Sequence, residues 1–406
     1  MRCATFLPQL CPRFAFGGAG ECRLPGMNQR PDGRYADFQD RYERGNVASP
    51  PNSARVIPAQ RPSVPYQPGD GVPYESGPSP RRRGKGKRIL ISILVVLLVV
   101  LAGTYFWADS KLRKEVDLGK VIDRPAQGEG TNYLIVGSDS RKGMSAARRK
   151  SLHTGGSAEA GQRTDSMMIL HVGAGGPTLI SLPRDSNVTI PEFRGSDSGK
   201  MRPAMGANKL NAAYAYDGPQ LLARTVEYNT GLHIDHYAEI GFTGFADIVD
   251  AMGGVRMNLD KGFTDKWSGA DFKAGEQTLN GGQALAYVRT RHAFAGSDLD
   301  RTKNQQKFLS TLASQVATPG TLLNPFTLYP VMSAGLDTLV VDKDMNPYLL
   351  AKMFFAMKDV SGGDGKSLNM PVSGSVGGNL QWDRPKVKQL VNELKNDDSV
   401  TVTSER

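Results

Sequence analysis

The stretch NYLIVGSDSR, residues 132–141, decides the fold of this chain. Its first half is a short apolar run, and Gly137 ends the run where serine, aspartate and arginine take over. Similar apolar runs occupy residues 166–172 and 178–182. Continuous runs of this length are typical of strands covered on both faces, so the sequence predicts a buried sheet.

Helical patterns alternate with these strands and follow them. The first two, 211–229 and 242–252, stop at Gly231 and at Gly253, as helices commonly do. Further helices are predicted at residues 282–288, 300–316, 349–360 and 385–395, and Pro319 and Gly320 stop the second of these. The alternation predicts an α/β domain with three layers, α-β-α, around a central mixed sheet.

Charged residues gather where the predicted strands begin and end. They form three Arg-Asp pairs, Asp139 with Arg141, Arg163 with Asp165, and Arg184 with Asp185. Because polar residues at strand ends of an α/β sheet face a shared crevice, the pairs are expected to converge. Later in the chain, Arg289 and Arg291 alternate as strand neighbours would, and Arg301 and Gln305 share a helix face.

Each of these motifs also has an ordinary structural interpretation, as a turn, a surface ion pair worth under ~1 kcal/mol, or an exposed strand face. Together they favour an anion site, because guanidinium groups gathered within ~5 Å repel by roughly 3 kcal/mol per pair at a dielectric of 20. Arginine forks match phosphate oxygens, and carboxylates suit a hard cation. The sum predicts a phosphate site assisted by Mg²⁺.

A run of uncharged residues, ILISILVVLLVVLAGTYFW at 89–107, precedes the domain. At ~1.5 Å per residue it can cross a hydrocarbon layer of ~30 Å, and its aromatic end suits an interface. A buried core helix or a cleaved signal peptide is less consistent with the lack of a polar face and with the internal position. Six basic residues precede the run and four follow it, so the N-terminus is expected in the cytoplasm and the rest outside.

Residues 1–88 are predicted to be a disordered cytoplasmic tail rich in Pro, Gly and Arg. All three cysteines lie at its start, so the exported part has neither a disulfide nor a thiol nucleophile. Met27 opens a polar segment, so residues 1–26 are expected to come from an over-extended reading frame. The net charge of +10 comes partly from this tail and does not indicate nucleic-acid binding.

Seven blocks resemble the LytR-CpsA-Psr family of cell-wall glycopolymer ligases. They are GSDSR, RTDSMMIL, SLPRDS, KLNAAYAYDG, HIDHYAEIGFTGFADIVDAMGGV, GGQALAYVRTRH and DLDRTKNQQ, in the family's order. The resemblance implies a linker at 108–130, a catalytic domain at 131–316 and a C-terminal helical extension at 317–406. It implies transfer of an anionic glycopolymer from a polyprenyl-pyrophosphate carrier to a peptidoglycan sugar hydroxyl at the cell membrane, leaving a phosphodiester link.

The resemblance also implies roles for single residues. Asp139 and Asp165 match the acidic pair that holds Mg²⁺. The positions expected to be catalytic are Arg163, Arg184, Arg289, Arg291 and Arg301, which line the phosphate pocket, and Asp298, a further family carboxylate. Those expected to bind substrate are Arg141, Lys209 and Gln305. Asp298 and Asp300 are both candidate bases. The apolar faces of the helices at 242–252 and 300–316, with Phe242, Phe245, Ile248, Val249, Met252, Phe308, Leu309 and Leu312, are candidate walls of a prenyl slot, or ordinary core.

Two other functions use the same features. A polyprenyl-pyrophosphate pyrophosphatase would share the site and use water as the acceptor. A non-catalytic envelope regulator or sensor, including one that binds DNA, is disfavoured because no helix-turn-helix with a basic recognition helix is present and the domain is expected outside. The expected partners are therefore the lipid-linked polymer, peptidoglycan and membrane lipids. The sequence does not distinguish teichoic acid, capsule and arabinogalactan as the polymer.

Overall fold

The structure is a computed structural model that describes residues 85–139, 144–154, 164–290 and 298–403. For Lys85, Asp165, Ser361 and residues 298–303 it describes the backbone alone. The predicted tail, 1–88, lies almost entirely outside these ranges. The described residues belong to one compact unit, which spans 81–406.

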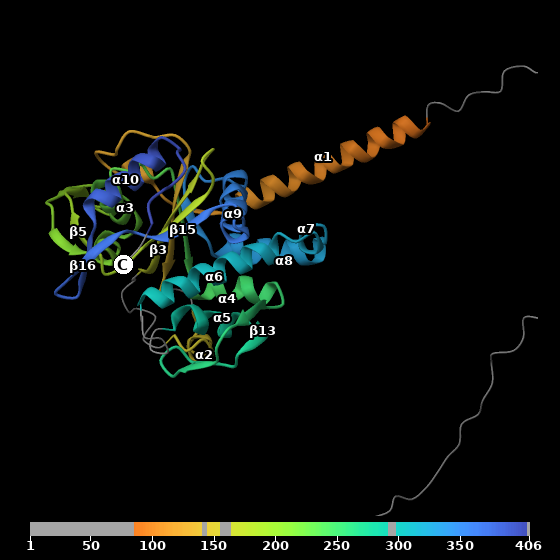
Figure 1. Cartoon of the computed structure of the whole chain (residues 1–406). Helices are drawn as coiled ribbons and strands as arrows, with labels where there is room; N and C mark the ends of the chain where they lie inside the picture. The colour runs from red at the N-terminus through yellow and green to blue at the C-terminus, as the bar shows by residue number, and fades with distance from the viewer. Residues whose placement is uncertain (1–84, 140–143, 155–163, 291–297, 404–406) are drawn as a thin grey trace, which may run out of the picture. The chain divides into compact units, whose positions relative to one another are not determined.

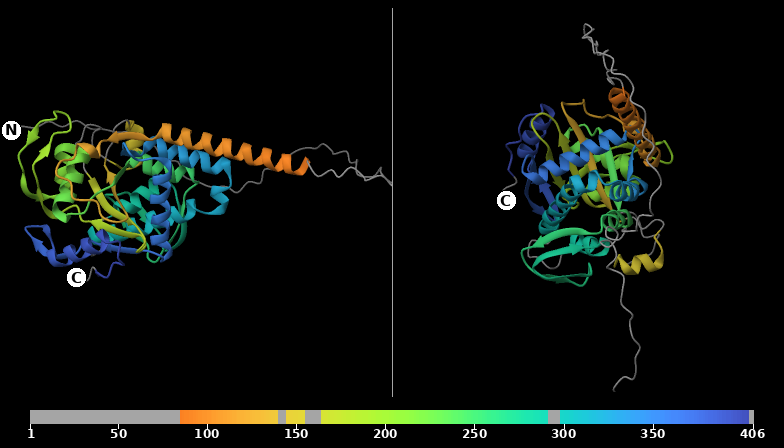
Figure 2. Two further views of the ribbon diagram at one scale, coloured as in Figure 1. Left: turned by 90° about the horizontal axis from the view of Figure 1, so that it is seen from above. Right: turned by 90° about the vertical axis from the view of Figure 1, so that its right-hand side faces the viewer.

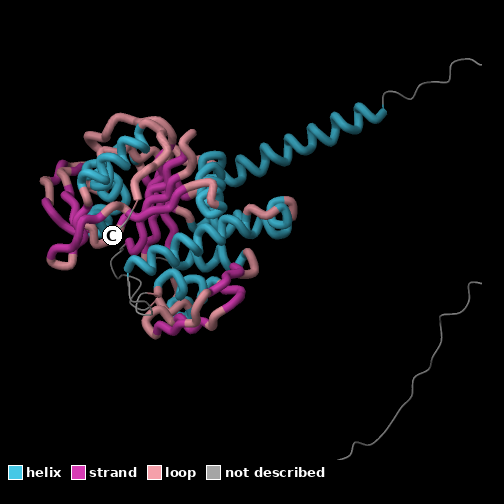
Figure 3. The backbone as a smooth tube through the Cα atoms, in the orientation of Figure 1, coloured by secondary structure: helices cyan, strands magenta, loops and turns pink. Residues whose placement is uncertain are grey.

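A seven-stranded mixed sheet forms the centre of the domain (Figures 1 and 3). Its strands, in spatial order, are β1 (Arg113–Val116), β14 (Val340–Asp342), β9 (His236–Gly241), β2 (Thr131–Ser138), β3 (Thr164–Val172), β4 (Thr178–Leu182) and β15 (Lys366–Asn369). β2 runs parallel to β9 and antiparallel to β3, which is antiparallel to β4. The three strands predicted from apolar runs are therefore β2, β3 and β4, side by side.

Helices cover both faces of the sheet, as the predicted three-layer α-β-α fold requires. On one face, α3 (Leu210–Thr230) and α10 (Arg384–Lys395) pack on side chains such as Leu134 and Val136. On the other face, α8 (Pro325–Thr338) and α9 (Pro347–Gly362) pack on their strand neighbours, such as Tyr133 and Ile135. Successive side chains of β2 point to opposite faces of the sheet, and helices cover both faces. β2 is therefore buried on both sides, as its uninterrupted apolar sequence indicates.

A separate group of helices and hairpins lies beyond one end of the strands (Figure 1). It contains α4 (Phe242–Ala251), α5 (Gly281–Arg289) and α6 (Asp298–Val316). Two small hairpins belong to it, β10 (Val255–Leu259) with β13 (Gly275–Leu279) and β11 (Phe263–Asp265) with β12 (Ala270–Phe272). Their apolar side chains form a second core.

The remaining elements of the domain are short helices and two-stranded hairpins. They are η1 (Leu118–Lys120), α2 (Ala146–Ser151), α7 (Pro319–Leu322) and the hairpins β5 (Asn187–Ile190) with β8 (Gly206–Lys209), β6 (Phe193–Arg194) with β7 (Met201–Arg202), and β16 (Val372–Val376) with β17 (Asn379–Trp382). α3 is interrupted where the sequence predicts a continuous helix. Asp217 and Gly218 leave helical geometry, and Gly218 takes a φ of 71° just before Pro219.

Within the described residues, α1 (Lys85–Lys111) is the one helix long and apolar enough to cross a membrane. Its apolar side chains are exposed from Ile89 to Leu101. Ala108 near its C-terminal end and Leu112 just after it join the core that α8 and α9 form. Figure 2 shows the other end of α1 extending away from the domain. A candidate single-pass anchor therefore continues directly into the domain.

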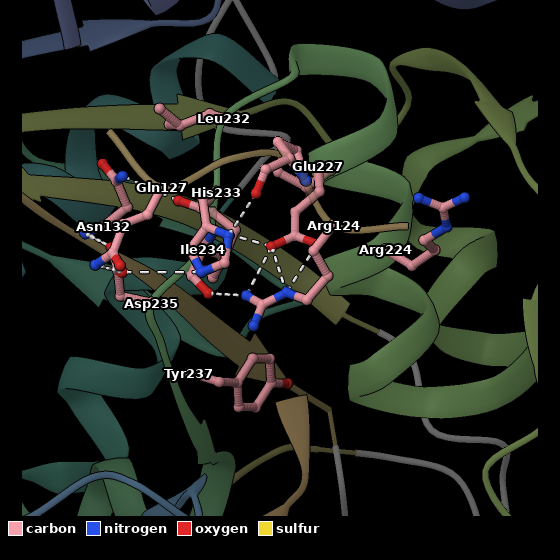
Figure 4. A network of polar contacts seen from close by, with 12 residues as sticks. Arg124, Gln127, Asn132, Arg224, Glu227, Leu232, His233, Ile234, Asp235 and Tyr237 are labelled. Carbon is pink, nitrogen blue, oxygen red and sulfur yellow. Dashed lines mark hydrogen bonds and ion pairs between the residues drawn. The ribbon is translucent and has the colours of Figure 1, made fainter. Parts of the chain in front are cut away.

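The segment expected to be a linker, 108–130, is part of the domain. β1 adds an edge strand that pairs with β14, and Arg124 reaches across to α3. Nη2 of Arg124 lies 2.8 Å from Oε1 of Glu227, whose side chain is fully buried, and it also donates to the carbonyl of Ile234 (Figure 4). The amide of Ile234 donates to the same carboxylate at 2.9 Å. This network fixes residues after the anchor to the start of β9.

The region after 316 also differs from a purely helical extension. It supplies α7 to α10, but β14 and β15 from the same region complete both halves of the central sheet. The sheet therefore depends on residues on both sides of 131–316.

Candidate functional site

One edge of the sheet collects the residues that the sequence singles out. β2, β4 and β9 end at this edge and β3 begins there, because Ser138 pairs with Thr164 on one side and with Gly241 on the other. Asp139 follows β2 directly. The pairing shifts between Gly137 and Ser138, which leaves Asp165 as the extra residue of a β-bulge in β3. Bulges often re-aim a side chain beside active sites, and here the backbone brings both predicted metal ligands to one place.

Arg184 and Lys209 meet at a third carboxylate. Nζ of Lys209 lies 2.7 Å from Oδ1 of Asp185, and Nε of Arg184 lies 3.4 Å from Oδ2 of the same group. Lys209 stands at the junction of β8 and α3, while Arg184 and Asp185 follow β4. Asp185 therefore gathers two of the predicted cations and reduces their mutual repulsion.

Arg289 is the last residue of α5, and this corrects the expectation that it lies on a strand. A capping box begins α5, in which Asn280 and Gln283 satisfy each other's backbone amides, and the helix runs one residue past the predicted end. Nη1 of Arg289 donates to the carbonyl of His153 at 3.1 Å. Its guanidinium carbon lies 4.8 Å from the centre of the Phe242 ring, within the range of a cation–π contact.

Gln305 is buried on α6 and connects that helix to α5. Its Nε2 donates to the carbonyl of Val288 at 3.0 Å. Arg301 lies four residues earlier on α6, so the two share a helix face as the sequence predicts. Asp298 is the first residue of α6.

The remaining predicted residues are only partly placed. Arg141, Arg163 and Arg291 lie outside the described residues. Asp165, Asp298 and Arg301 are placed by their backbone alone. The side chains that the structure describes are thus those of Asp139, Arg184, Lys209, Arg289 and Gln305, drawn from five different elements or their ends.

An apolar cavity lies on one side of this edge, between the strands and the helices α4, α5 and α6. We call it the apolar cavity, and its walls are Ile135, Val136, Gly137, Ser138, Ser166, Met168, Ile240, Gly241, Phe242, Phe245, Leu285, Val288, Arg289, Gln305 and Leu309. Three predicted members of a prenyl slot, Phe242, Phe245 and Leu309, line it. Phe308 instead lies fully buried against the rings of Phe245 and Tyr287 as ordinary core.

The volume of the apolar cavity is about 90 Å³. Pockets for small organic ligands are typically ~300–1,000 Å³, so a long apolar chain would fit only after the walls separate. One wall is formed by paired strands of the sheet and the other by α4, α5 and α6. Among the residues that the structure describes, Arg289 is the only charged one in the walls.

A second, polar cleft of about 530 Å³ lies on the other side of the same strand ends. It shares Ser138 and Gly241 with the apolar cavity, and its other walls include Glu115, Tyr214, Glu239 and Asp337. The Ser138 hydroxyl is buried between the two and has no well-aligned hydrogen-bond partner among the residues that the structure describes. The end of β2 therefore separates an apolar compartment from a polar one.

Glu239 is the buried carboxylate of the polar cleft. It accepts hydrogen bonds from the phenols of Tyr214 at 2.8 Å and Tyr237 at 2.7 Å. Burial, and then the charge of Glu239, raise the pKa of both tyrosines well above the ordinary value, so both remain hydrogen-bond donors. Sequence reasoning missed Glu239, although an acidic residue inside the apolar run HYAEIG was a usable signal.

The carboxylates suit magnesium by type and number. Among the described residues, no three His, Cys, Asp or Glu side chains form a group that could enclose a metal. Mg²⁺ does not need such a cage, since it commonly binds through one or two carboxylates, substrate phosphates and water. Asp139 and Asp165, at paired strand ends, fit that requirement.

An apolar cavity bordered by an arginine, beside clustered cations and carboxylates, is typical of a protein that binds a ligand with an apolar tail and an anionic head. The LytR_cpsA_psr family model matches residues 105–396, so the chain belongs to the LytR-CpsA-Psr family. The match extends on both sides of 131–316, in agreement with the strands that those regions supply.

Similar proteins fit this assignment. The probable cell wall biosynthesis protein LcpB of Corynebacterium glutamicum is 40% identical over 340 residues, which cover 82% of this chain and 77% of LcpB. The cell wall biosynthesis protein LcpA of the same species is 29% identical, over 76% of this chain and 64% of LcpA. Among solved structures, a LytR-Csp2A-Psr enzyme from Actinomyces oris has a TM-score of 0.53 at 19% identity, over 70% of this chain and 96% of that one, and shows the shared fold.

Proposed function

We propose that this protein transfers an anionic cell-wall glycopolymer from a polyprenyl-pyrophosphate carrier to a sugar hydroxyl of peptidoglycan, with the help of Mg²⁺. The observation that carries the proposal is the position of Arg289. Of the described residues that line the apolar cavity it is the charged one, and it lies at the sheet edge where Asp139 follows β2. A prenyl chain in the cavity would bring its pyrophosphate to that edge.

The chain's own residues supply binding and charge stabilisation. Arg289 and the Lys209, Asp185, Arg184 cluster would neutralise charge on the phosphates, with Arg163, Arg291 and Arg301 added from the family pattern. Asp139 and Asp165 would hold Mg²⁺, which supplies further neutralisation of phosphate charge when bound. Phosphoryl transfer needs little covalent work from the protein, so positioning and electrostatics account for most of the catalysis.

The attacking sugar hydroxyl must lose a proton. Asp298 and Asp300 stand in the first turn of α6 and remain the candidate bases. The new bond forms between the hydroxyl oxygen and the phosphorus nearest the polymer, and the carrier leaves as a prenyl phosphate. Water in place of the sugar would give a pyrophosphatase, so the acceptor distinguishes the two activities.

The polar cleft is suited to a sugar. Sugars present hydroxyls that carboxylates and phenols bind, and the cleft offers Glu239, Glu115 and Tyr214 on the opposite side of β2 from the apolar cavity. Glu239→Gln should raise the KM for the sugar-bearing substrate that occupies the cleft more than it lowers kcat. An unchanged KM for both substrates would remove the cleft from the proposal.

A location for the reaction follows from α1. We propose that α1 spans the cell membrane with the domain outside, because positive charge is denser before the helix than after it. A reporter that is active only after export, fused behind Arg406, should be active. Activity of a cytoplasm-specific reporter at that position would contradict both the location and the reaction.

The reaction itself is tested with a radiolabelled lipid-linked glycopolymer, purified peptidoglycan, Mg²⁺ and the full chain in detergent or vesicles. The expected product is label attached to peptidoglycan and released by phosphodiester cleavage. Label that appears only as free polymer would identify a pyrophosphatase. No turnover of any kind, with binding retained, would favour a regulator.

Binding is measured separately by thermal unfolding with a prenyl pyrophosphate and Mg²⁺. A ligand at ~100 times its dissociation constant stabilises the folded state by about 2.7 kcal/mol, which raises the melting temperature. Pyrophosphate without a prenyl chain should stabilise much less, because it leaves the apolar cavity empty. Equal shifts for the two ligands would argue against the cavity.

A further inference from the structure

An apolar tip projects from the domain beside α1. It consists of residues 322–329, between α7 and the second turn of α8, and four of its side chains are large, apolar and exposed. Phe326 is 89% exposed and Leu323 is 82% exposed, with Leu322 and Tyr329 at 36% and 37%. The sequence carries no charged residue from Phe308 to Leu336. Apolar surface gathered in this way usually marks a binding surface.

The tip lies beside the part of α1 that is expected in the membrane. The hydroxyls of Tyr329 and Thr104 are 2.5 Å apart, and the rings of Tyr329 and Trp107 lie 5.5 Å apart. A shallow groove between the two helices is lined by Val100, Gly103, Thr104, Trp107 and Tyr329.

A second contact fixes the direction of α8 relative to α1. Nζ of Lys111 lies 3.1 Å from Oδ1 of Asp337. Both helices therefore run the same way, since Thr104 meets Tyr329 and the later Lys111 meets the later Asp337. The start of α8 consequently points back toward the apolar middle of α1, and Figures 1 and 2 show α7 and α8 projecting on the side where α1 leaves the domain.

This register gives an approximate depth for the tip. Phe326 precedes Tyr329 by three residues, which places it near the level of Leu101 on α1 if the helices stay parallel. Leu101 lies about 9 Å from Trp107 along the axis of α1, on the side away from the domain, at ~1.5 Å per residue. Trp107 closes the apolar run of α1 and suits the membrane interface, and interfacial helices bury their apolar faces ~5–10 Å.

We infer that residues 322–329 form a second membrane contact. They insert into the leaflet nearer the folded domain, which α1 also crosses. The occupant of this surface is lipid, because the tip shares the level of apolar α1 side chains. The inference rests on α1 spanning the membrane and not on the transfer reaction. It also connects the bilayer to the apolar cavity, because α8 packs closely on α4 at Gly244 and Thr338, and α4 provides Phe242 and Phe245.

The test uses the full chain in liposomes with single cysteines. The three native cysteines are all in the first 22 residues and can be replaced by serine. Leu323→Cys and Phe326→Cys then report on the tip, and Val376→Cys is the control, since Val376 is 69% exposed on the β16–β17 hairpin. Each cysteine carries a fluorophore that is sensitive to polarity.

The expected result is blue-shifted emission at both tip positions, with strong quenching by lipids that carry a nitroxide near the headgroup and weak quenching by aqueous iodide. The control should show the opposite pattern. Equal iodide quenching at Phe326→Cys and Val376→Cys would overturn the inference. Protection from iodide without quenching by spin-labelled lipid would indicate a protein partner or a second copy, and would overturn it as well.

Phe326→Asp supplies a functional readout. It should reduce turnover of a long-chain carrier embedded in vesicles several-fold, and leave turnover of a short-chain, water-soluble donor unchanged. Loss with both donors would show damage to the site instead of lost membrane contact. Inactivity of the unmodified protein with both donors would reject the transfer proposal, while the fluorescence result would still stand.

Discussion

The guanidinium of Arg289 lies over the ring of Phe242, with 4.8 Å between the guanidinium carbon and the ring centre. One contact thus joins the charged edge of the sheet to the wall of the apolar cavity. It holds the cation at the boundary between the two environments, where the proposed function places the pyrophosphate of the substrate.

Arg289→Ala should reduce transfer by roughly 10²–10³, the usual cost of losing one preorganised donor. Arg289→Lys should recover little, because an ammonium cannot reproduce a bidentate fork. Phe242→Leu keeps the arginine and removes the ring, so it should cost less than either change. The measurement is the initial rate of label transfer, with circular dichroism as the check on folding, and wild-type rates in folded Arg289→Ala would remove this residue from the site.

Asp139→Asn and Asp165→Asn should reduce transfer chiefly by weakening Mg²⁺ binding, because each removes one carboxylate ligand. Rates measured against Mg²⁺ concentration should show a raised requirement and partial rescue at high Mg²⁺. Arg289→Ala should show no such rescue. Asp197→Asn, an exposed position, is the matched control and should follow the wild-type curve.

Arg124→Met should destabilise the domain by about 3–5 kcal/mol, since it leaves the buried Glu227 carboxylate without its cation. Adding Glu227→Gln to that variant should restore part of the loss. Urea unfolding of the two single variants and the double variant gives the coupling. Additive losses would show that the pair does not hold the segment after α1 to α3.

Gly281→Ala should destabilise the domain by about 1–3 kcal/mol, because a Cβ there would meet the carbonyl oxygen of Ala246 at 2.3 Å. Gly282→Ala is the matched control, with its nearest neighbour at an ordinary 3.5 Å. It should leave stability unchanged or raise it slightly, since alanine favours helix. Melting temperatures compare the two, and equal values would contradict the close packing of α5 on α4.

The stability of the domain should fall as the pH drops below about 6.5, the ordinary value for histidine. Burial lowers the pKa of His171, against the opposing effect of Asp397, so the unfolded chain takes up the proton first. The contribution is present above that value and is lost toward the lower pKa of the folded state. Urea midpoints between pH 5 and 8 should show the slope, and His171→Gln should flatten it.

Much of the fold was predictable because its strands and helices carry strong local signals. The apolar runs predicted β2, β3 and β4. The glycines that end helices predicted α3 and α4, whose observed ends lie within two residues of the predicted ones. β1 was not predictable in the same way. RKEV is four residues long and mostly charged, and only its pairing with β14 makes it a strand.

β9 was missed for a related reason. Its sequence contains Glu239, and the two tyrosines that make this carboxylate tolerable in the core come together only in the folded domain. For Arg289 a strand was predicted where the structure has a helix. Two arginines with alternate spacing suggest a strand, but α5 begins with a capping box at Asn280 and extends to Arg289. The convergence of strand ends at one edge was predictable because it follows from topology.

α1 ends at Lys111 and β1 begins at Arg113, so the anchor and the sheet are joined with no flexible stalk between them. With α1 in the membrane, as proposed, the distance between the charged edge and the bilayer is set by the fold itself. A site held in this way can act only on chemical groups at one constant distance from the membrane. In the lipid-linked polymer of the proposed function, that group is the polymer end nearest the carrier. The length of the polymer beyond this end should therefore have no influence on the rate of the proposed reaction.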